Sequence, residues 1–152
     1  MRAYVAAKLA LALVMSALVI AVIYLLGWSL EARMDGTAWA LTYVIAVVSV
    51  VIPSLLGLVV GMLVGSEDAY GLVGGGMSLL GFLSGMFIPL DQLGKVFQTI
   101  AKFTPLWGIN VAATGPLDGW KQWSWEPAVN IAVWTIALVA LCILAAGRIT
   151  RR

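Results

Sequence analysis

Long uncharged stretches separated by short polar segments dominate the pattern of the chain. Uncharged runs of 22, 31, 22 and 21 residues lie between Lys8 and Glu31, Asp35 and Glu67, Asp68 and Asp91, and Glu126 and Arg148. A helix needs about 20 apolar residues to cross roughly 30 Å of hydrocarbon. The runs lack the alternation of polar and apolar residues that barrel strands require. The pattern therefore predicts four transmembrane helices, near residues 10–30, 40–64, 70–87 and 127–146.

The composition places the whole chain, residues 1–152, in one transmembrane domain. Hydrophobic residues make up 62% of the sequence and charged residues 11%, and so short a chain cannot bury that much apolar surface away from water. We expect an all-α, polytopic membrane protein that binds no nucleic acid, and not a soluble enzyme. The chain has no histidine and a single cysteine, Cys142, so we also expect no catalytic residues, no cofactor and no metal site.

The positions of basic residues and tryptophans indicate how the spans are oriented. Four spans leave both termini on one side, which then holds five basic and two acidic residues, a net charge of +3. The other side holds four basic and five acidic residues, a net charge of −1. Six of the seven tryptophans fall on this second side, as in an interfacial belt. We expect a multi-pass protein of the cell (cytoplasmic) membrane with both termini in the cytoplasm.

The segment between the third and fourth spans, residues 88–126, has an amphipathic pattern of its own. Apolar residues recur at helical spacing from Leu90 to Phe103, which predicts one interfacial helix over 90–103. Pro89 precedes this helix and Pro105 ends it. A second apolar segment of unassigned form follows, and residues 115–120 have turn chemistry. The segment is either an extracytoplasmic re-entrant hairpin or an ordinary loop resting on the headgroups.

Small residues form a stripe in the third span. They are spaced 3, 4, 3 and 4 residues apart, at Gly71, Gly74, Ser78, Gly81 and Gly85. Such stripes permit close helix contact in lipid. The contact is with another helix of this chain, with a second subunit, or with a transport path. In the second span Pro53 removes one helical hydrogen bond and predicts a kink.

Groups that could carry chemistry are few. No span contains a charge, and Asn130 and Thr135 are the strongest polar groups of the last span. Residues of this kind usually form hydrogen bonds between helices, and a path lined by them suits a lipophilic substrate. Gly94 and Lys95 do not form a phosphate loop, because the required flanking glycine and hydroxyl residue are missing. Glu67 and Asp68 form either a solvated turn or a contact with a cytoplasmic partner.

Residues 83–105, LSGMFIPLDQLGKVFQTIAKFTP, resemble a signature of the permease subunits of type-2 ATP-binding-cassette exporters. Residues 57–68, GLVVGMLVGSED, are similar to the fourth span of that family and the turn after it. Gly94 departs from the pattern, because the family prefers proline there. The matching signature residues are Ser84, Gly85, Pro89, Leu93, Ile100 and Pro105.

The resemblance implies that the four spans correspond to the third to sixth of six, with the missing spans truncated or supplied by another polypeptide. It implies that residues 88–126 form a re-entrant hairpin, and that the third span borders the transport path and the dimer interface. The implied partners are a cytoplasmic ATPase touching Glu67 and Asp68, a second permease subunit in a homo- or heterodimer, and the lipid bilayer. The implied function is ATP-driven export of a lipophilic drug, lipid or polymer. The alternative is a non-transporting membrane anchor or assembly subunit.

Overall fold

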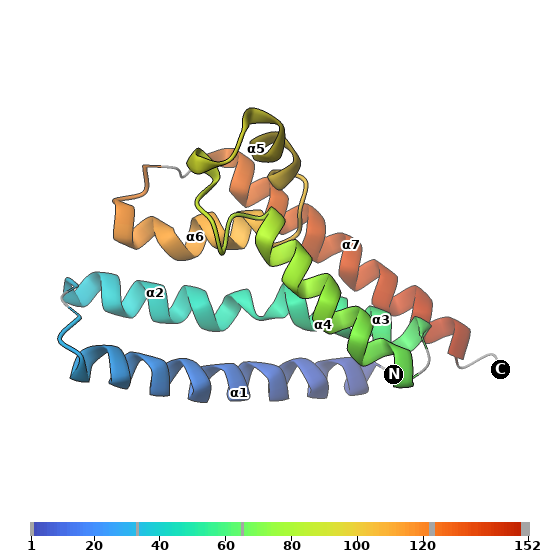
Figure 1. The fold of residues 1–152 in the computed structure, drawn as a ribbon. Helices are drawn as coiled ribbons and strands as arrows, with labels where there is room; N and C mark the ends of the chain where they lie inside the picture. Colours follow the sequence, from blue (N-terminus) through green and yellow to red (C-terminus); the bar gives the residue numbers. More distant parts are fainter. Residues whose placement is uncertain (1, 33, 65, 122–123, 150–152) are drawn as a thin grey trace.

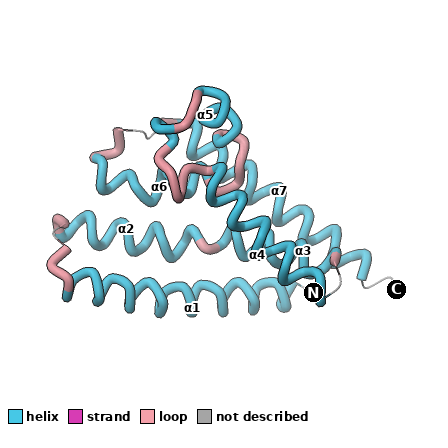
Figure 2. The backbone as a smooth tube through the Cα atoms, in the orientation of Figure 1, coloured by secondary structure: helices cyan, strands magenta, loops and turns pink. Residues whose placement is uncertain are grey.

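The computed structural model describes residues 2–32, 34–64, 66–121 and 124–149, and these form helices joined by short loops (Figures 1 and 2). In chain order the elements are α1 (Arg2–Ser29), α2 (Gly36–Ser49), α3 (Val51–Leu63), α4 (Ser66–Leu83), the short 3₁₀ helix η1 (Leu90–Gln92), α5 (Lys95–Ala101), α6 (Trp107–Asp118) and α7 (Trp125–Ile149). The prediction of an all-α protein is confirmed.

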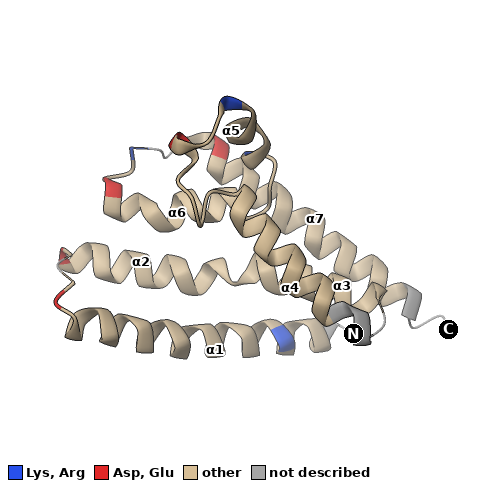
Figure 3. Cartoon of the chain, in the orientation of Figure 1, with Lys and Arg blue, Asp and Glu red and all other residues tan. Residues whose placement is uncertain are grey.

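Among the described residues, three helical stretches are long and apolar enough to cross a membrane, and these are Ala3–Ser29, Gly36–Leu63 and Trp125–Gly147. A fourth stretch, Tyr70–Leu83 within α4, is apolar but shorter. The charged residues among those described lie toward the ends of the long helices and in the hairpin (Figure 3). The arrangement is that of a polytopic membrane protein.

The helix α4 ends at Leu83, four residues before the predicted end of the third span. The chain turns there because Gly85 adopts a left-handed conformation with φ of 82°. The amides of Gly85 and Met86 donate to the carbonyls of Phe82 and Gly81, at 3.2 and 3.1 Å. This pair of hydrogen bonds is the Schellman motif that commonly closes helices.

The second span is interrupted at its middle, between α2 and α3. Val50 separates the two helices, and Pro53 lies in the first turn of α3. Proline has no amide hydrogen to donate to the carbonyl of Ser49, four residues earlier. Figure 2 shows the interruption as a short loop within an otherwise continuous rod. The kink predicted at Pro53 therefore matches the observed break.

The core of the bundle lies between α3 and α7. Leu55 and Leu138 are almost completely buried there, and the Cys142 thiol lies 3.8 Å from the carbonyl oxygen of Leu55. By contrast, α1 lies at the edge of the bundle beside α2 (Figure 1), and none of its most apolar window is buried. The Tyr43 hydroxyl joins the two outer helices by donating to the carbonyl of Ala17 at 3.1 Å. Because α1 packs on one side only, its other side is free to face lipid.

Candidate functional site

We use the name hairpin for residues 88–126. Its first arm contains two short helices, η1 and α5. The prediction of one helix over 90–103 is wrong, because Leu93 and Gly94 are extended, with ψ of 149° and 156°. The side-chain amide of Gln98 donates to the carbonyls of Leu90 and Leu93, at 2.9 and 3.0 Å. A side chain that bonds these carbonyls offers the backbone an alternative to the helix. The chain therefore forms η1, breaks, and begins α5 at Lys95.

The second arm is the regular helix α6, whose form the sequence left open. The turn expected over 115–120 begins later, because Gly115 and Pro116 still belong to this helix. Gly119 ends α6 in a left-handed conformation with φ of 70°. The amide of Trp120 then donates to the carbonyl of Gly115 at 2.8 Å. Only the last part of the predicted turn segment is a turn.

Asn130 of α7 joins the hairpin to the last span. Its side-chain amide donates to the carbonyls of Lys102 and Thr104, at 2.8 and 3.0 Å. Its side-chain oxygen accepts from the amide of Gly108 at 3.3 Å. Asn130 is buried, so water cannot readily replace these bonds. One side chain thus satisfies three backbone groups at the corner between α5 and α6.

Gly108 allows α6 to approach α7 closely at this corner. A Cβ atom placed on Gly108 would lie 2.7 Å from the carbonyl oxygen of Pro127 and 2.8 Å from the side-chain oxygen of Asn130. Nearby, the indole of Trp134 donates to the carbonyl of Phe103 at 3.1 Å. The sequence pointed to Asn130 as a polar group of the last span. The sequence analysis did not identify Gly108 or the backbone partners of Asn130.

Two of the signature residues, Ser84 and Gly85, lie at the junction of α4 with the hairpin. Ser84 is fully buried, and its carbonyl accepts from the Asn110 side chain at 3.3 Å. A Cβ atom on Gly85 would lie 2.5 Å from the Leu90 side chain. Pro89 precedes η1, Leu93 ends it, and Pro105 is buried just before α6. The hairpin is therefore fixed to α4 as well as to α7.

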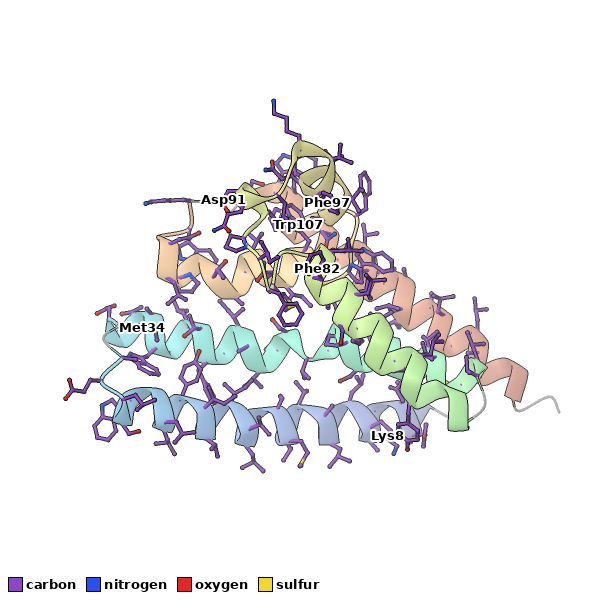
Figure 4. All side chains as sticks on the ribbon, viewed as in Figure 1. Lys8, Met34, Phe82, Asp91, Phe97 and Trp107 are labelled. Atoms are coloured by element: carbon purple, nitrogen blue, oxygen red, sulfur yellow. The ribbon has the colours of Figure 1, made fainter. Side chains whose placement is uncertain are left out.

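The α5 part of the hairpin has an exposed apolar surface. The exposed residues are Val96, Phe97, Ile100 and Phe103. Figure 4 shows Phe97 and Trp107 in this outer part of the molecule, beyond the end of α4. The surface suits contact with the lipid interface or with another subunit.

A salt bridge lies on the outside of the same junction. Lys102 Nζ lies 2.6 Å from Glu126 Oε2, and the side chains are 48% and 41% exposed. Exposed ion pairs of this kind contribute about 0–1 kcal/mol. The buried Asn130 bonds, not this pair, therefore supply the main polar connection between hairpin and α7.

The small-residue stripe divides into two parts. Gly71, Gly74 and Ser78 are exposed, and Cβ atoms on the two glycines would meet no heavy atom within 4 Å. A Cβ atom on Gly81, by contrast, would lie 2.9 Å from the Phe87 ring. Gly85 lies outside α4, so the prediction of a five-residue helical seam is wrong at that position. We call Gly71 and Ser78 the free face of α4, and Gly74 lies at its border.

Glu67 and Asp68 belong to the first turn of α4 by their backbone. Their side chains lie outside the described residues. Gly65, the last small residue of the second span, also lies outside them. The contact predicted between Glu67, Asp68 and an ATPase remains a prediction. Within the part of the chain that the structure describes, no three His, Cys, Asp or Glu residues cluster to hold a metal.

The fold is that of a polytopic membrane protein. A family model described as "ABC-2 type transporter" matches residues 1–115. The chain belongs to this family, and it is a permease subunit rather than a nucleotide-binding domain. The match ends within α6, before Asn130. Comparisons with curated proteins and with solved structures gave no match.

The close approach at Gly108 generates a stability prediction. Gly108→Ala should destabilise the protein by about 1–3 kcal/mol, because the added methyl overpacks the contact with Pro127 and Asn130. Gly94→Ala is the matched control, since a Cβ atom there meets nothing within 4 Å and φ is −60°. Thermal unfolding in detergent measures both. Equal midpoints for the two variants would contradict the packing described here.

Proposed function

We propose that the chain is the permease of an ATP-driven exporter that moves a lipophilic substrate, such as a drug, a lipid or a polymer, across the cytoplasmic membrane. Family membership supplies the transport role. The absence of charge from the spans supports a lipophilic substrate, because residues 36–63 and 127–147 contain no charged side chain. Transporters coupled to protons or ions usually keep an ionisable group within their spans.

The free face of α4 is the observation that carries this proposal. In lipid, small residues permit close contact between helices. Cβ atoms on Gly71 and Gly74 would nevertheless meet no heavy atom within 4 Å. Another helix fits this face better than lipid alone. We assign it to a second permease subunit, with the transport path running beside the same helix.

The hairpin couples α4 to α7 at the end of the bundle away from the termini. Asn110 bonds Ser84 at the end of α4, and Asn130 of α7 bonds the α5–α6 corner. A shift of α4 therefore moves the hairpin against α7. In the proposed cycle, ATP binding closes the partner ATPases, and this motion moves the spans between inward-facing and outward-facing states.

The proposed orientation places both termini in the cytoplasm. Figure 1 shows the start of α1 and the end of α7 at the same end of the bundle, beside the start of α4. This end includes Glu67 and Asp68, in the first turn of α4. We assign this turn to the contact with a cytoplasmic ABC ATPase, because acidic side chains there can pair with basic residues of a partner.

Co-purification tests the ATPase assignment. The tagged chain, isolated from membranes of its own host in mild detergent, should carry an ABC ATPase identified by mass spectrometry and by ATP hydrolysis. Replacing Glu67 and Asp68 together by lysine should reduce the recovered ATPase by about tenfold or more, because like charges across a contact cost several kcal/mol.

The control for this experiment is Asp91→Lys, which changes an acidic residue in the hairpin and should leave ATPase recovery unchanged. Absence of any ABC ATPase from the wild-type preparation would contradict the exporter and favour the non-transporting anchor. Unchanged recovery from the double lysine variant would contradict the assigned contact alone.

Self-association tests the free face of α4. Gly71→Leu and Ser78→Leu should each reduce the dimer fraction severalfold in chemical cross-linking within nanodiscs, because the larger side chain prevents close helix approach. Leucine favours helix more than glycine or serine does, so unfolding of α4 would not explain the loss. Ala10→Leu on exposed α1 is the control. A dimer fraction equal to wild type in both α4 variants would exclude this interface.

A further inference from the structure

A groove of about 700 Å³ opens between α1, α3 and α4 at the end of the bundle that bears the termini. It is separate from the hairpin and from Asn130. Each helix contributes residues one turn apart, so a single face of each lines the groove. The lining residues are Tyr4 and Lys8 of α1, Ser54, Gly57, Leu58 and Gly61 of α3, and Tyr70, Val73 and Gly74 of α4.

Glycines keep the groove open. Cβ atoms on Gly57, Gly61 and Gly74 would meet no heavy atom within 4 Å. Both α1 and α4 pack against α3, so α3 forms the floor and the other two helices form the walls. The side chains of the described residues therefore leave the space between the walls open.

The lining changes from polar to apolar along the groove. Tyr4, Lys8 and Tyr70 lie at the mouth, near the helix ends, and all three are exposed. Figure 4 shows Lys8 at this end of α1, beside the start of α4. Its Nζ lies 5.7 Å from the centre of the Tyr4 ring, one turn nearer the terminus. The Lys8 side chain therefore extends toward the end of the helix, as lysine side chains at a membrane interface do.

The interior of the groove is mainly hydrocarbon and backbone. Leu58 and Val73 line it from facing helices. Ser54 lies seven residues before Gly61 on α3, about 10 Å deeper at 1.5 Å per residue. A mouth with one lysine and two tyrosines, above an apolar interior, matches an amphiphile whose head lies at the interface and whose chain points inward.

We propose that this groove binds one anionic phospholipid from the leaflet on the side of the termini. Its phosphate lies at Lys8, within reach of the Tyr4 and Tyr70 hydroxyls, and one acyl chain lies over Gly57 and beside Val73. Basic pockets between transmembrane helices bind anionic headgroups in this way.

The mouth favours a lipid over a second transmembrane helix, because Lys8 is among the lining residues and an anionic headgroup would pair with its ammonium. The lipid is a structural ligand and not the transported substrate, so its binding does not depend on the proposed transport function.

Native mass spectrometry of the full chain in detergent tests this site without any ATPase. Phosphatidylglycerol and phosphatidylcholine with identical acyl chains are titrated separately. The wild-type chain should retain one lipid and bind phosphatidylglycerol about fivefold more tightly, which is the gain expected from one lysine near an anionic headgroup. Equal binding of the two lipids would overturn the proposal.

Two variants separate the head and chain contacts. Lys8→Gln should abolish the preference for phosphatidylglycerol, and Gly57→Leu should abolish retention of either lipid by filling the floor of the groove. The matched controls are Lys121→Gln, at the opposite end, and Gly71→Leu, on the free face of α4; both should bind lipid as wild type does. Circular dichroism confirms that each variant remains helical.

Three results would contradict the site. The first is a phosphatidylglycerol preference that survives Lys8→Gln. The second is lipid retention that survives Gly57→Leu. The third is loss of self-association, with unchanged lipid binding, in Gly57→Leu, which would assign the groove to a helix of a second copy. Since Gly71→Leu tests the subunit interface separately, failure of the lipid site and failure of the proposed function are distinguishable.

Discussion

Buried backbone groups need partners within the protein, and Asn130 meets this requirement for the hairpin. Unpaired amides and carbonyls are costly where water is scarce. Between α5 and α6 the chain is irregular, so the carbonyls of Lys102 and Thr104 need donors from outside a helix. The Asn130 amide bonds both carbonyls, and its oxygen accepts from the amide of Gly108. Glycine at 108 lets α6 come close enough for this bond. The position of the hairpin, and with it the end of α4, depends on these contacts.

The helix α4 connects the functional features of the molecule. One end is tied to the hairpin through Ser84, its outer side is the free face, and its first turns form a wall of the lipid groove. Its inner side packs on α3, which is held by the buried contact of Leu55 with α7. In the proposed exporter, α4 is therefore the element that transmits motion from an ATPase at one end to the hairpin at the other.

The hydrophobic pattern predicts the long helices because the cost of charges in lipid acts on every residue of a span. The break at Pro53 is equally predictable from missing hydrogen bonding. The form of the hairpin is less predictable from the sequence. Apolar spacing over 90–103 favours one helix, yet the Gln98 amide binds the carbonyls of Leu90 and Leu93 instead. Gly85 continues the small-residue spacing but serves as a helix cap. The bonds of Asn130 join residues 22 to 28 positions apart, and nothing in one sequence specifies such pairings.

Hydrogen–deuterium exchange of Asn130→Ala tests most directly whether this residue holds the hairpin in place. The measurement compares wild type and variant in nanodiscs, peptide by peptide. We predict faster exchange over residues 95–108, since the variant frees Gly108 and the α5–α6 corner, and unchanged exchange in α1 and α2. Glu126→Gln, which removes only the exposed salt bridge with Lys102, should exchange as wild type does. Exchange over 95–108 that is the same in Asn130→Ala and wild type would contradict the account.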